Sequence, residues 1–159
     1  MSDFQQILEG EHSELLDSIT DGYWVLNIEN DKLVPEEYLS PAFKAQFGYE
    51  DHEIPNTNDG WLKIIHKDDA KRALDQFFRH IHDGDPYRLV VRYHHKDGST
   101  IWILCRGCAV KDSEGRWSKM LGTHTNITTL KNTSENYDRL CVVLRELQFD
   151  KINSLLDGV

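Results

Sequence analysis

The sequence predicts an α+β domain in which helices cover one face of an antiparallel sheet. Strand-like segments lie at about 87–95, 100–110 and 117–127, and the turns between them contain Asp97-Gly98 and Glu114-Gly115. Such dipeptides between alternating segments are typical of hairpins, so these three strands should be antiparallel. A long amphipathic helix precedes the three strands and another follows them. The length of 159 residues fits one domain with additional residues at its ends.

The N-terminal part of the chain is expected to form a helix and two strands. Residues 1–17 carry apolar side chains at helical spacing, which predicts a short amphipathic helix. A strand is expected over Tyr23–Ile28. Asn30-Asp31 then turns the chain through local side-chain hydrogen bonds, and a second strand ends at Tyr38-Leu39.

The middle of the chain is expected to be helical, with one loop. Ser40-Pro41 begins a short helix, with Ser40 as its cap, and Gly48 ends it. The polar segment 50–60 is expected to be a loop, followed by an apolar turn at 61–65. The longest internal helix is expected over Asp68–His82, because its first residues are acidic and its apolar residues recur three and four apart.

The composition excludes several classes of protein. Lys and Arg number 18 and Asp and Glu number 27, so the formal net charge is −9, which argues against a nucleic-acid partner. No apolar segment approaches the roughly 18 residues that span a bilayer, and the N-terminus does not resemble a signal peptide. We therefore expect a cytoplasmic protein without membrane contact, whose three cysteines are free thiols.

Four segments carry a resemblance to a known family. They are YLSPAFKAQFGYE (38–50), DGWLKIIHKDDAKRA (59–73), VRYHHKDGSTIWILCRGCAVKDSEG (91–115) and MLGTHTNIT (120–128). In this order and spacing they resemble the PAS family in its PAS-PAC form. The resemblance implies a five-stranded antiparallel sheet in the order 2-1-5-4-3, with helices on one face and often a pocket between sheet and helices. Such modules sense ligands, light, redox state or oxygen, or simply dimerise.

The resemblance divides the chain into three parts. Residues 1–17 form the N-terminal amphipathic helix, residues 18–131 the PAS-PAC core, and residues 132–159 a C-terminal signalling helix. An apolar stripe follows this last helix: Tyr137, Leu140, Cys141, Leu144, Leu147, Gln148, Ile152, Leu155 and Leu156. The stripe either dimerises and passes a signal to an effector domain or partner protein, or folds back on the sheet. We expect a homodimer formed through the N- and C-terminal helices.

Strand alternation indicates which side chains face the helices. The inward sets, chosen by apolar character and by the resemblance, combine with side chains from the helices to form a candidate binding site. Its predicted residues are His124, Tyr93, Ile103, Cys105, Met120, Asn126, Phe43, Phe47, Trp61, Leu74, Phe77 and Phe78. Aromatic residues here could stack on a planar ligand, or they could simply fill the core.

Two polar positions depart from relatives. In flavin-binding light-oxygen-voltage relatives, a glutamine that contacts the flavin occupies the place of His124. His124 is therefore expected either to contact a ligand or titrate near about pH 6.5, or to be a buried histidine paired with Tyr93 or a backbone carbonyl. The family usually ends its last strand with Asp-Ile-Thr, whereas this chain has Asn126-Ile127-Thr128, and asparagine cannot form the ion pair that the aspartate makes in relatives.

Cofactor and enzyme chemistry are constrained by what the motifs contain. No cysteine precedes Cys105, so the covalent flavin photochemistry of relatives is excluded, whereas haem and non-covalent flavin stay open. His80 and His82 point in different directions on a helix, and His66 is expected to cap that helix or bond to the backbone. Neither zinc-ligand spacing nor a nucleophile–base set or phosphate loop occurs, and the inward strand faces offer no carboxylate. We do not expect an enzyme.

The sequence favours a sensory module that binds a small molecule or cofactor between sheet and helices. It would signal through rearrangement of a homodimer and through the C-terminal helix. The alternative is a ligand-free protein-interaction and dimerisation module, for example the input domain of a histidine kinase or a diguanylate cyclase.

Overall fold

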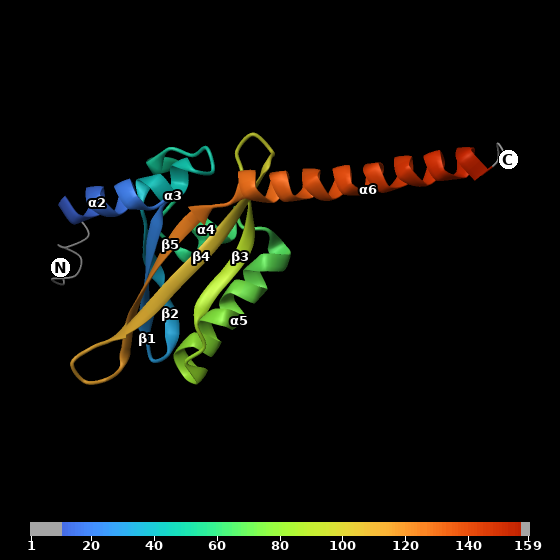
Figure 1. Ribbon diagram of the computed structural model, residues 1–159. Helices are drawn as coiled ribbons and strands as arrows, with labels where there is room; N and C mark the ends of the chain where they lie inside the picture. Colours follow the sequence, from blue (N-terminus) through green and yellow to red (C-terminus); the bar gives the residue numbers. More distant parts are fainter. Residues whose placement is uncertain (1–10, 157–159) are drawn as a thin grey trace. The chain divides into compact units, whose positions relative to one another are not determined.

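A computed structural model of the chain describes the backbone of residues 11–156 and the side chains of residues 14–143. A five-stranded antiparallel sheet in the order β2-β1-β5-β4-β3 is its centre (Figure 1). The strands are β1 (Tyr23–Glu29), β2 (Lys32–Leu39), β3 (Tyr87–His94), β4 (Thr100–Lys111) and β5 (Trp117–Asn126). The predicted fold class and the predicted strand order are confirmed.

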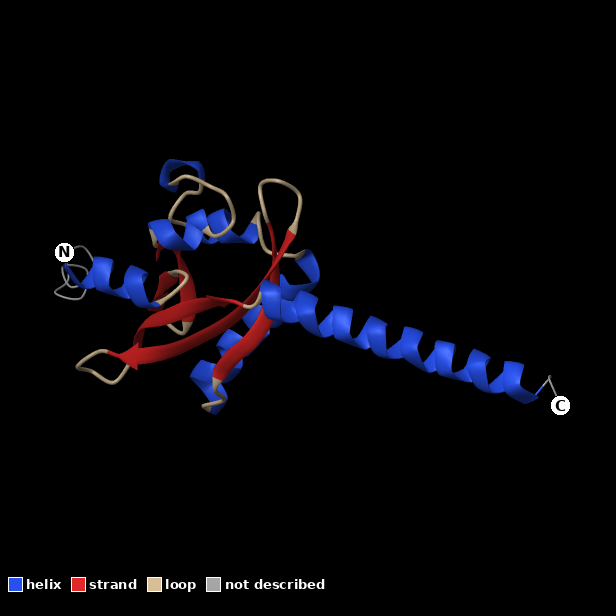
Figure 2. Cartoon of the chain, turned by 45° about the horizontal axis from the view of Figure 1, so that its top comes forward, coloured by secondary structure: helices blue, strands red, loops and turns tan. Residues whose placement is uncertain are grey.

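Helices account for most of the remaining described residues, as the colouring of Figure 2 shows. They are α2 (Glu11–Ile19), α3 (Pro41–Ala45), the 3₁₀ helix η1 (Asp51–Glu53), α4 (Asn58–Leu62), α5 (Lys67–Asp83) and α6 (Thr128–Leu156). The chain divides into two compact units, Met1–Ile127 and Thr128–Val159.

Several predicted boundaries shift. The predicted first helix lies over residues 1–17, of which residues 1–10 are outside the described part, and α2 continues to Ile19. The predicted loop at 50–60 contains η1 and the start of α4. The helix that begins at Pro41 ends at Ala45, and the chain then reaches Gly48 through a turn in which the Gly48 φ is 81°. The C-terminal helix begins at Thr128, before the expected residue 132.

Local side-chain chemistry explains how the elements begin. The buried Ser40 hydroxyl accepts hydrogen bonds from the backbone N–H groups of Phe43 and Tyr23, at 3.1 Å each. One side chain therefore caps α3 and also ties it to β1. Asn30 and Asp31 have φ values of 50° and 60°, a left-handed conformation that these two residue types tolerate, so they close the tight turn between β1 and β2.

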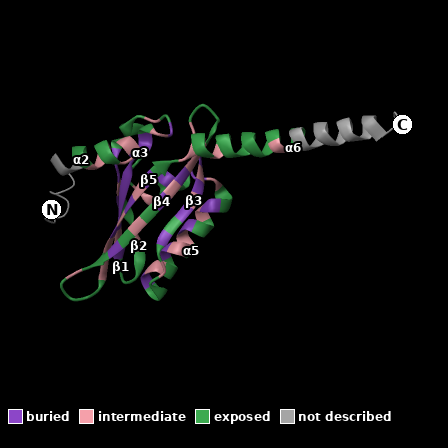
Figure 3. Ribbon diagram, in the orientation of Figure 1, coloured by how far each residue is buried: buried purple, intermediate pink, exposed green. Residues whose placement is uncertain are grey.

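The two faces of the sheet are covered differently. On the inner face, Trp24, Leu26 and Ile28 of β1 belong to the main core with the residues of α3, α4 and α5. On the outer face, Tyr23 and Val25 form a smaller cluster, against which Leu16 of α2, Tyr38 and Leu121 pack. Figure 3 shows the buried residues as purple segments on β1 and β3. On β3 the side chains predicted to face the helices, Leu89, Val91 and Tyr93, are buried, so the predicted alternation is present there.

Helix α6 is described by itself. It contains 29 residues. Of its described apolar side chains, Tyr137 is 67% exposed, Leu140, Val142 and Val143 are about half exposed, and Cys141 is half-buried. The side chains of the predicted stripe from Leu144 onward lie outside the described residues. None of the described helices combines the length and apolar character that crossing a membrane requires.

Candidate ligand-binding site

A cavity of about 40 Å³ lies between the inner face of the sheet and the helices. One buried water molecule needs roughly 10–15 Å³ by this measure, so the cavity has room for about three. Residues of the strands and of the helical segment between β2 and β3 line it: Trp24, Leu26, Glu37, Leu39, Phe43, Trp61, Ile65, Ala73, Tyr87, Val91, Tyr93 and Cys105. The predicted pocket between sheet and helices therefore has a counterpart in the structure.

Five of the twelve lining residues are aromatic. Trp24 of β1 meets Tyr87 of β3 edge to face, with ring centroids 5.9 Å apart. Phe43 of α3 meets Tyr93 of β3 in the same manner at 6.1 Å. Edge-to-face pairs are a favoured arrangement of aromatic rings, so these contacts fix the side walls. Trp61 of α4 and Ala73 of α5 complete the wall on the helix side.

Glu37 is the charged residue among the described residues that line the cavity. The sequence prediction did not include it. It lies on β2 opposite Leu26 of β1 and is only 6% exposed. Among the described residues, neither of its carboxyl oxygens has a hydrogen-bond partner, and the same is true of the buried indole Nε1 of Trp61. Burial raises the pKa of Glu37 to about 8, and the Trp61 indole nearby offsets part of this rise.

The other ionisable groups of the lining are held in their neutral forms. Burial raises the pKa of the Cys105 thiol to about 12. Burial also raises the pKa values of Tyr87 and Tyr93 well above the usual range of tyrosine. Of the ionisable side chains that line the cavity, Glu37 is therefore the one with a pKa close to neutral pH. The expectation that the inward strand faces carry no carboxylate is wrong.

Most of the predicted site residues are buried, and some of these line the cavity. Phe43, Trp61, Tyr93 and Cys105 line the cavity. Others are buried in the core without lining it: Phe47, Phe77, Ile103, Met120 and His124.

The remaining three predicted site residues are not buried. Leu74 is half-buried, and Phe78 of α5 is 40% exposed. Phe78 follows the buried Phe77 directly, so it points about 100° away from it around the helix. Asn126 is the last residue of β5, and it is exposed at that end of the sheet.

His124 is enclosed by aromatic rings and is 1% exposed. Its ring centroid lies 4.6 Å from that of Phe43 and 5.5 Å from that of Tyr93. The Gln46 amide donates to its Nδ1 at 2.9 Å, and no described residue pairs with its Nε2. Burial lowers the pKa of His124 to about 3, so it stays neutral near pH 7 and does not titrate there. Its partner is Gln46 rather than the expected Tyr93 or a backbone carbonyl.

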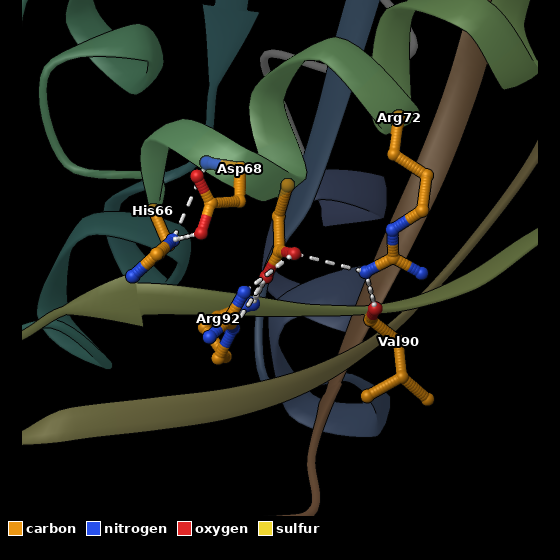
Figure 4. A network of polar contacts seen from close by, with 6 residues as sticks. His66, Asp68, Arg72, Val90 and Arg92 are labelled. Atoms are coloured by element: carbon orange, nitrogen blue, oxygen red, sulfur yellow. Dashed lines mark hydrogen bonds and ion pairs between the residues drawn. The ribbon is translucent and has the colours of Figure 1, made fainter.

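A polar network joins the start of α5 to β3, and Figure 4 shows it from close by. Asp69 is buried, and both its carboxyl oxygens accept from the Arg92 guanidinium, at 2.9 and 3.0 Å. Arg72 donates to Asp69 at 3.1 Å and to the Val90 carbonyl at 2.5 Å. These partners hold the pKa of Asp69 well below its usual range although burial opposes them. The network fixes the helix that carries Ala73 against the sheet.

The histidines considered for haem have other partners. His66 caps α5 by accepting from the Asp68 backbone N–H at 3.3 Å, as the sequence predicted. His80 contacts the Asp85 carbonyl with Nδ1 at 2.6 Å, and its Nε2 accepts from the Ala109 N–H at 3.1 Å. Within residues 14–143, whose side chains are described, no histidine lines the cavity.

The cavity also fails to match either cofactor in size. Its volume of about 40 Å³ is far below the roughly 150 Å³ that accommodates benzene. The residues present therefore fit neither haem nor flavin. Within the described residues, no group of His, Cys, Asp and Glu could hold a metal ion.

With this fold and cavity established, comparison with known proteins identifies the class. The family model described as PAS fold matches residues 36–124, which is more than half of the chain. The chain therefore belongs to the PAS family, as the four sequence segments predicted. It is a PAS sensory domain.

Three known proteins show where such domains occur. A sensory box histidine kinase/response regulator from Burkholderia thailandensis E264 has a crystal structure that is 32% identical, with a TM-score of 0.62 over 87% of this chain and 98% of that chain. The peroxide stress-activated histidine kinase of Schizosaccharomyces pombe is 28% identical over 96 residues, which are 60% of this chain and 4% of that protein. The N-terminal domain of a diguanylate cyclase with PAS/PAC sensor from Marinobacter aquaeolei shares the fold, with a TM-score of 0.57 and 19% identity over 69% of this chain and 97% of that one.

Proposed function

We propose that this chain is a cytoplasmic, non-catalytic input module that binds a small organic molecule in the cavity and passes the change to an effector. The observation that carries the proposal is the cavity itself, in which the Glu37 carboxyl and the Trp61 indole lack hydrogen-bond partners among the described residues. An unpaired buried polar group costs free energy. A ligand that pairs with the Glu37 carboxyl recovers that free energy, which favours the bound state.

Ligand binding would bias the arrangement of the elements that share the cavity. Glu37 lies on β2 and Trp61 on α4, and these two elements pack against each other. A ligand that contacts both residues stabilises one arrangement of α4 on the sheet more than others. A signal requires this kind of differential binding between two states.

Output through a homodimer is the second half of the proposal. The apolar side chains of Tyr137, Leu140, Val142 and Val143 in α6 are exposed. A single helix is marginally stable in water, so such a surface is expected to pack against a partner. The histidine kinases to which the chain is similar make an effector domain or a separate effector protein a reasonable recipient of the signal.

A cavity-filling variant tests ligand binding. Ala73→Leu adds side-chain volume to the cavity wall, whereas Ala45→Leu makes the same change at an exposed position of α3. We expect ligand-observed NMR with small amines, alcohols and amides to show binding to the wild type and to Ala45→Leu, and loss of binding to Ala73→Leu. Binding by none of these compounds, or equal binding to Ala73→Leu, would favour the ligand-free interaction module.

Light scattering tests the homodimer. At tens of micromolar protein, we expect the mass of two chains for the 159-residue chain. Tyr137→Lys with Leu140→Lys places two charges on the exposed surface of α6 and should give the mass of one chain. A single-chain mass for the wild type would contradict output through a homodimer of this chain.

A further inference from the structure

The cavity combines one carboxyl group with five aromatic rings. The rings belong to Trp24, Phe43, Trp61, Tyr87 and Tyr93. Among the residues whose side chains the structure describes, no lysine, arginine or histidine that could neutralise a carboxylate lines the cavity. A buried carboxylate is stable only when a cation or several hydrogen-bond donors pair with it.

We propose that the ligand is a small organic cation, an amine or methylated ammonium of about four heavy atoms, whose nitrogen pairs with the Glu37 carboxylate and whose carbon atoms contact the aromatic walls. This inference rests on the proposed function, because it assigns the chemical class of ligand to the same cavity. Aromatic faces attract ammonium groups, and rings arranged around such a group form the cages that recognise them. The space for about three water molecules limits the ligand to a few heavy atoms.

The hydrogen-bonding capacity of the site matches a cation better than other ligands. An ionised carboxylate only accepts hydrogen bonds, and an ammonium group only donates them. The Glu37 carboxylate can then accept from the ligand as well as from the nearby Trp61 indole N–H. A carboxylate ligand would meet repulsion from Glu37, and the net charge of −9 also favours the approach of cations over anions.

Binding is expected to release a proton. Glu37 without a bound cation is largely protonated at pH 7, because its pKa is about 8. A cation must therefore displace the carboxyl proton when it binds. The other titratable groups that face the cavity, Tyr87, Tyr93 and Cys105, stay neutral in this range. Asp59 of α4, which packs on β2, and Lys63 directly after α4 are exposed and do not line the cavity. The affinity should therefore rise with pH up to about 8.

The experiment compares two probes of equal shape. Isopropylammonium chloride and propan-2-ol are titrated into the ¹⁵N-labelled full chain at pH 7.5, with sodium chloride added to match ionic strength. The Trp61 indole N–H signal, assigned with Trp61→Phe, reports the cavity. We expect isopropylammonium to shift this signal at a concentration at least about tenfold lower than propan-2-ol.

Two variants on β2 distinguish binding in the cavity from binding at the surface. Glu37→Gln keeps the shape of the side chain and removes its charge, and it should weaken isopropylammonium binding by at least about tenfold. Glu36→Gln makes the same change at the adjacent exposed residue and should bind as the wild type does. Urea unfolding of each variant verifies that it is folded.

The outcomes distinguish the inference from the proposed function. Equal binding of the two probes, or unchanged binding by folded Glu37→Gln, would overturn the cation inference and leave a ligand cavity. If the wild type bound neither probe, and none of the neutral compounds of the ligand-observed NMR experiment, both the cation inference and the proposed ligand binding would be overturned. Tighter isopropylammonium binding at pH 6 than at pH 8 would also contradict the inference.

Discussion

Replacing Glu37 with glutamine should change how stability depends on pH. The folded-state pKa of Glu37 is about 8, whereas an unperturbed glutamate has 4.5. A folded-state pKa that is raised means that the folded state binds more protons than the unfolded state between these values, so wild-type stability falls as pH rises from about 4.5 to 8. One pKa unit corresponds to about 1.4 kcal/mol. The loss between pH 5 and pH 8 is therefore about 3 kcal/mol.

The assay is urea unfolding followed by tryptophan fluorescence at pH 5 and pH 8. Glutamine does not titrate, so Glu37→Gln should gain about 3 kcal/mol relative to the wild type between the two pH values. Other titrating groups are present in both proteins and cancel in this difference. Glu36→Gln is the control, and its stability relative to the wild type should stay constant within about 0.5 kcal/mol. A constant difference for Glu37→Gln would refute the argument that burial perturbs this carboxyl.

Three further substitutions test the parts of the fold that surround the cavity. Asp69→Asn should lower the free energy of unfolding by about 3 kcal/mol, because it leaves the Arg92 guanidinium without its buried carboxylate partner. The control is Asp75→Asn, which removes an exposed ion pair. Its effect on the free energy of unfolding in urea should stay within about 0.5 kcal/mol. Gly122→Ala should destabilise by about 3 kcal/mol, since an added Cβ overlaps the neighbouring tryptophan ring. Gly107→Ala should cost less because its nearest neighbour, at 2.8 Å, is the flexible end of a methionine, and an equal loss for both glycines would contradict the packing argument. The wild type should lose about 3 kcal/mol of stability as the pH falls from 6.5 to 4, because His124, whose folded-state pKa is about 3, must remain uncharged in the folded state. His124→Gln should remove this loss. Parallel pH profiles of stability for the two proteins would show that burial of the imidazole does not cause the loss.

The sequence predicts the sheet well because its signals are local. The Asp-Gly and Glu-Gly turns and the alternation along β3 define three antiparallel strands without knowledge of the rest of the chain. The helix expected over Asp68–His82 is observed over Lys67–Asp83 for the same reason, since acidic residues at its start and apolar spacing both lie within it.

The site is harder to predict because burial depends on distant contacts. Glu36 and Glu37 are adjacent carboxylates that look equally solvent-exposed in the sequence, yet Glu37 is buried and Glu36 is exposed. One signal was available: Glu37 is two residues before the buried Leu39, so the two share a face of β2. Strand β2 also contains Pro35, which weakens the strand pattern in the sequence but is tolerated at a sheet edge.

Geometry explains why Phe78 and Asn126, two of the predicted site residues, are exposed. Phe78 matches the apolar spacing of α5, but the buried stripe follows Ala73, Phe77 and Ile81 at intervals of four residues. Asn126 continues the alternation of His124, yet β5 ends there and the residue is exposed. Periodicity predicts which face a side chain occupies, whereas the edge of the core decides whether that face is covered.

The most direct test is a ¹³C NMR titration of the Glu37 side-chain carboxyl carbon, with and without saturating isopropylammonium. Assignment comes from the signal that disappears in Glu37→Gln. The proposed cavity site predicts a pKa near about 8 without the amine and a clearly lower pKa with it, because the bound cation favours the ionised carboxylate. An ordinary glutamate pKa, or a pKa that the amine leaves unchanged, would contradict a cation site at Glu37.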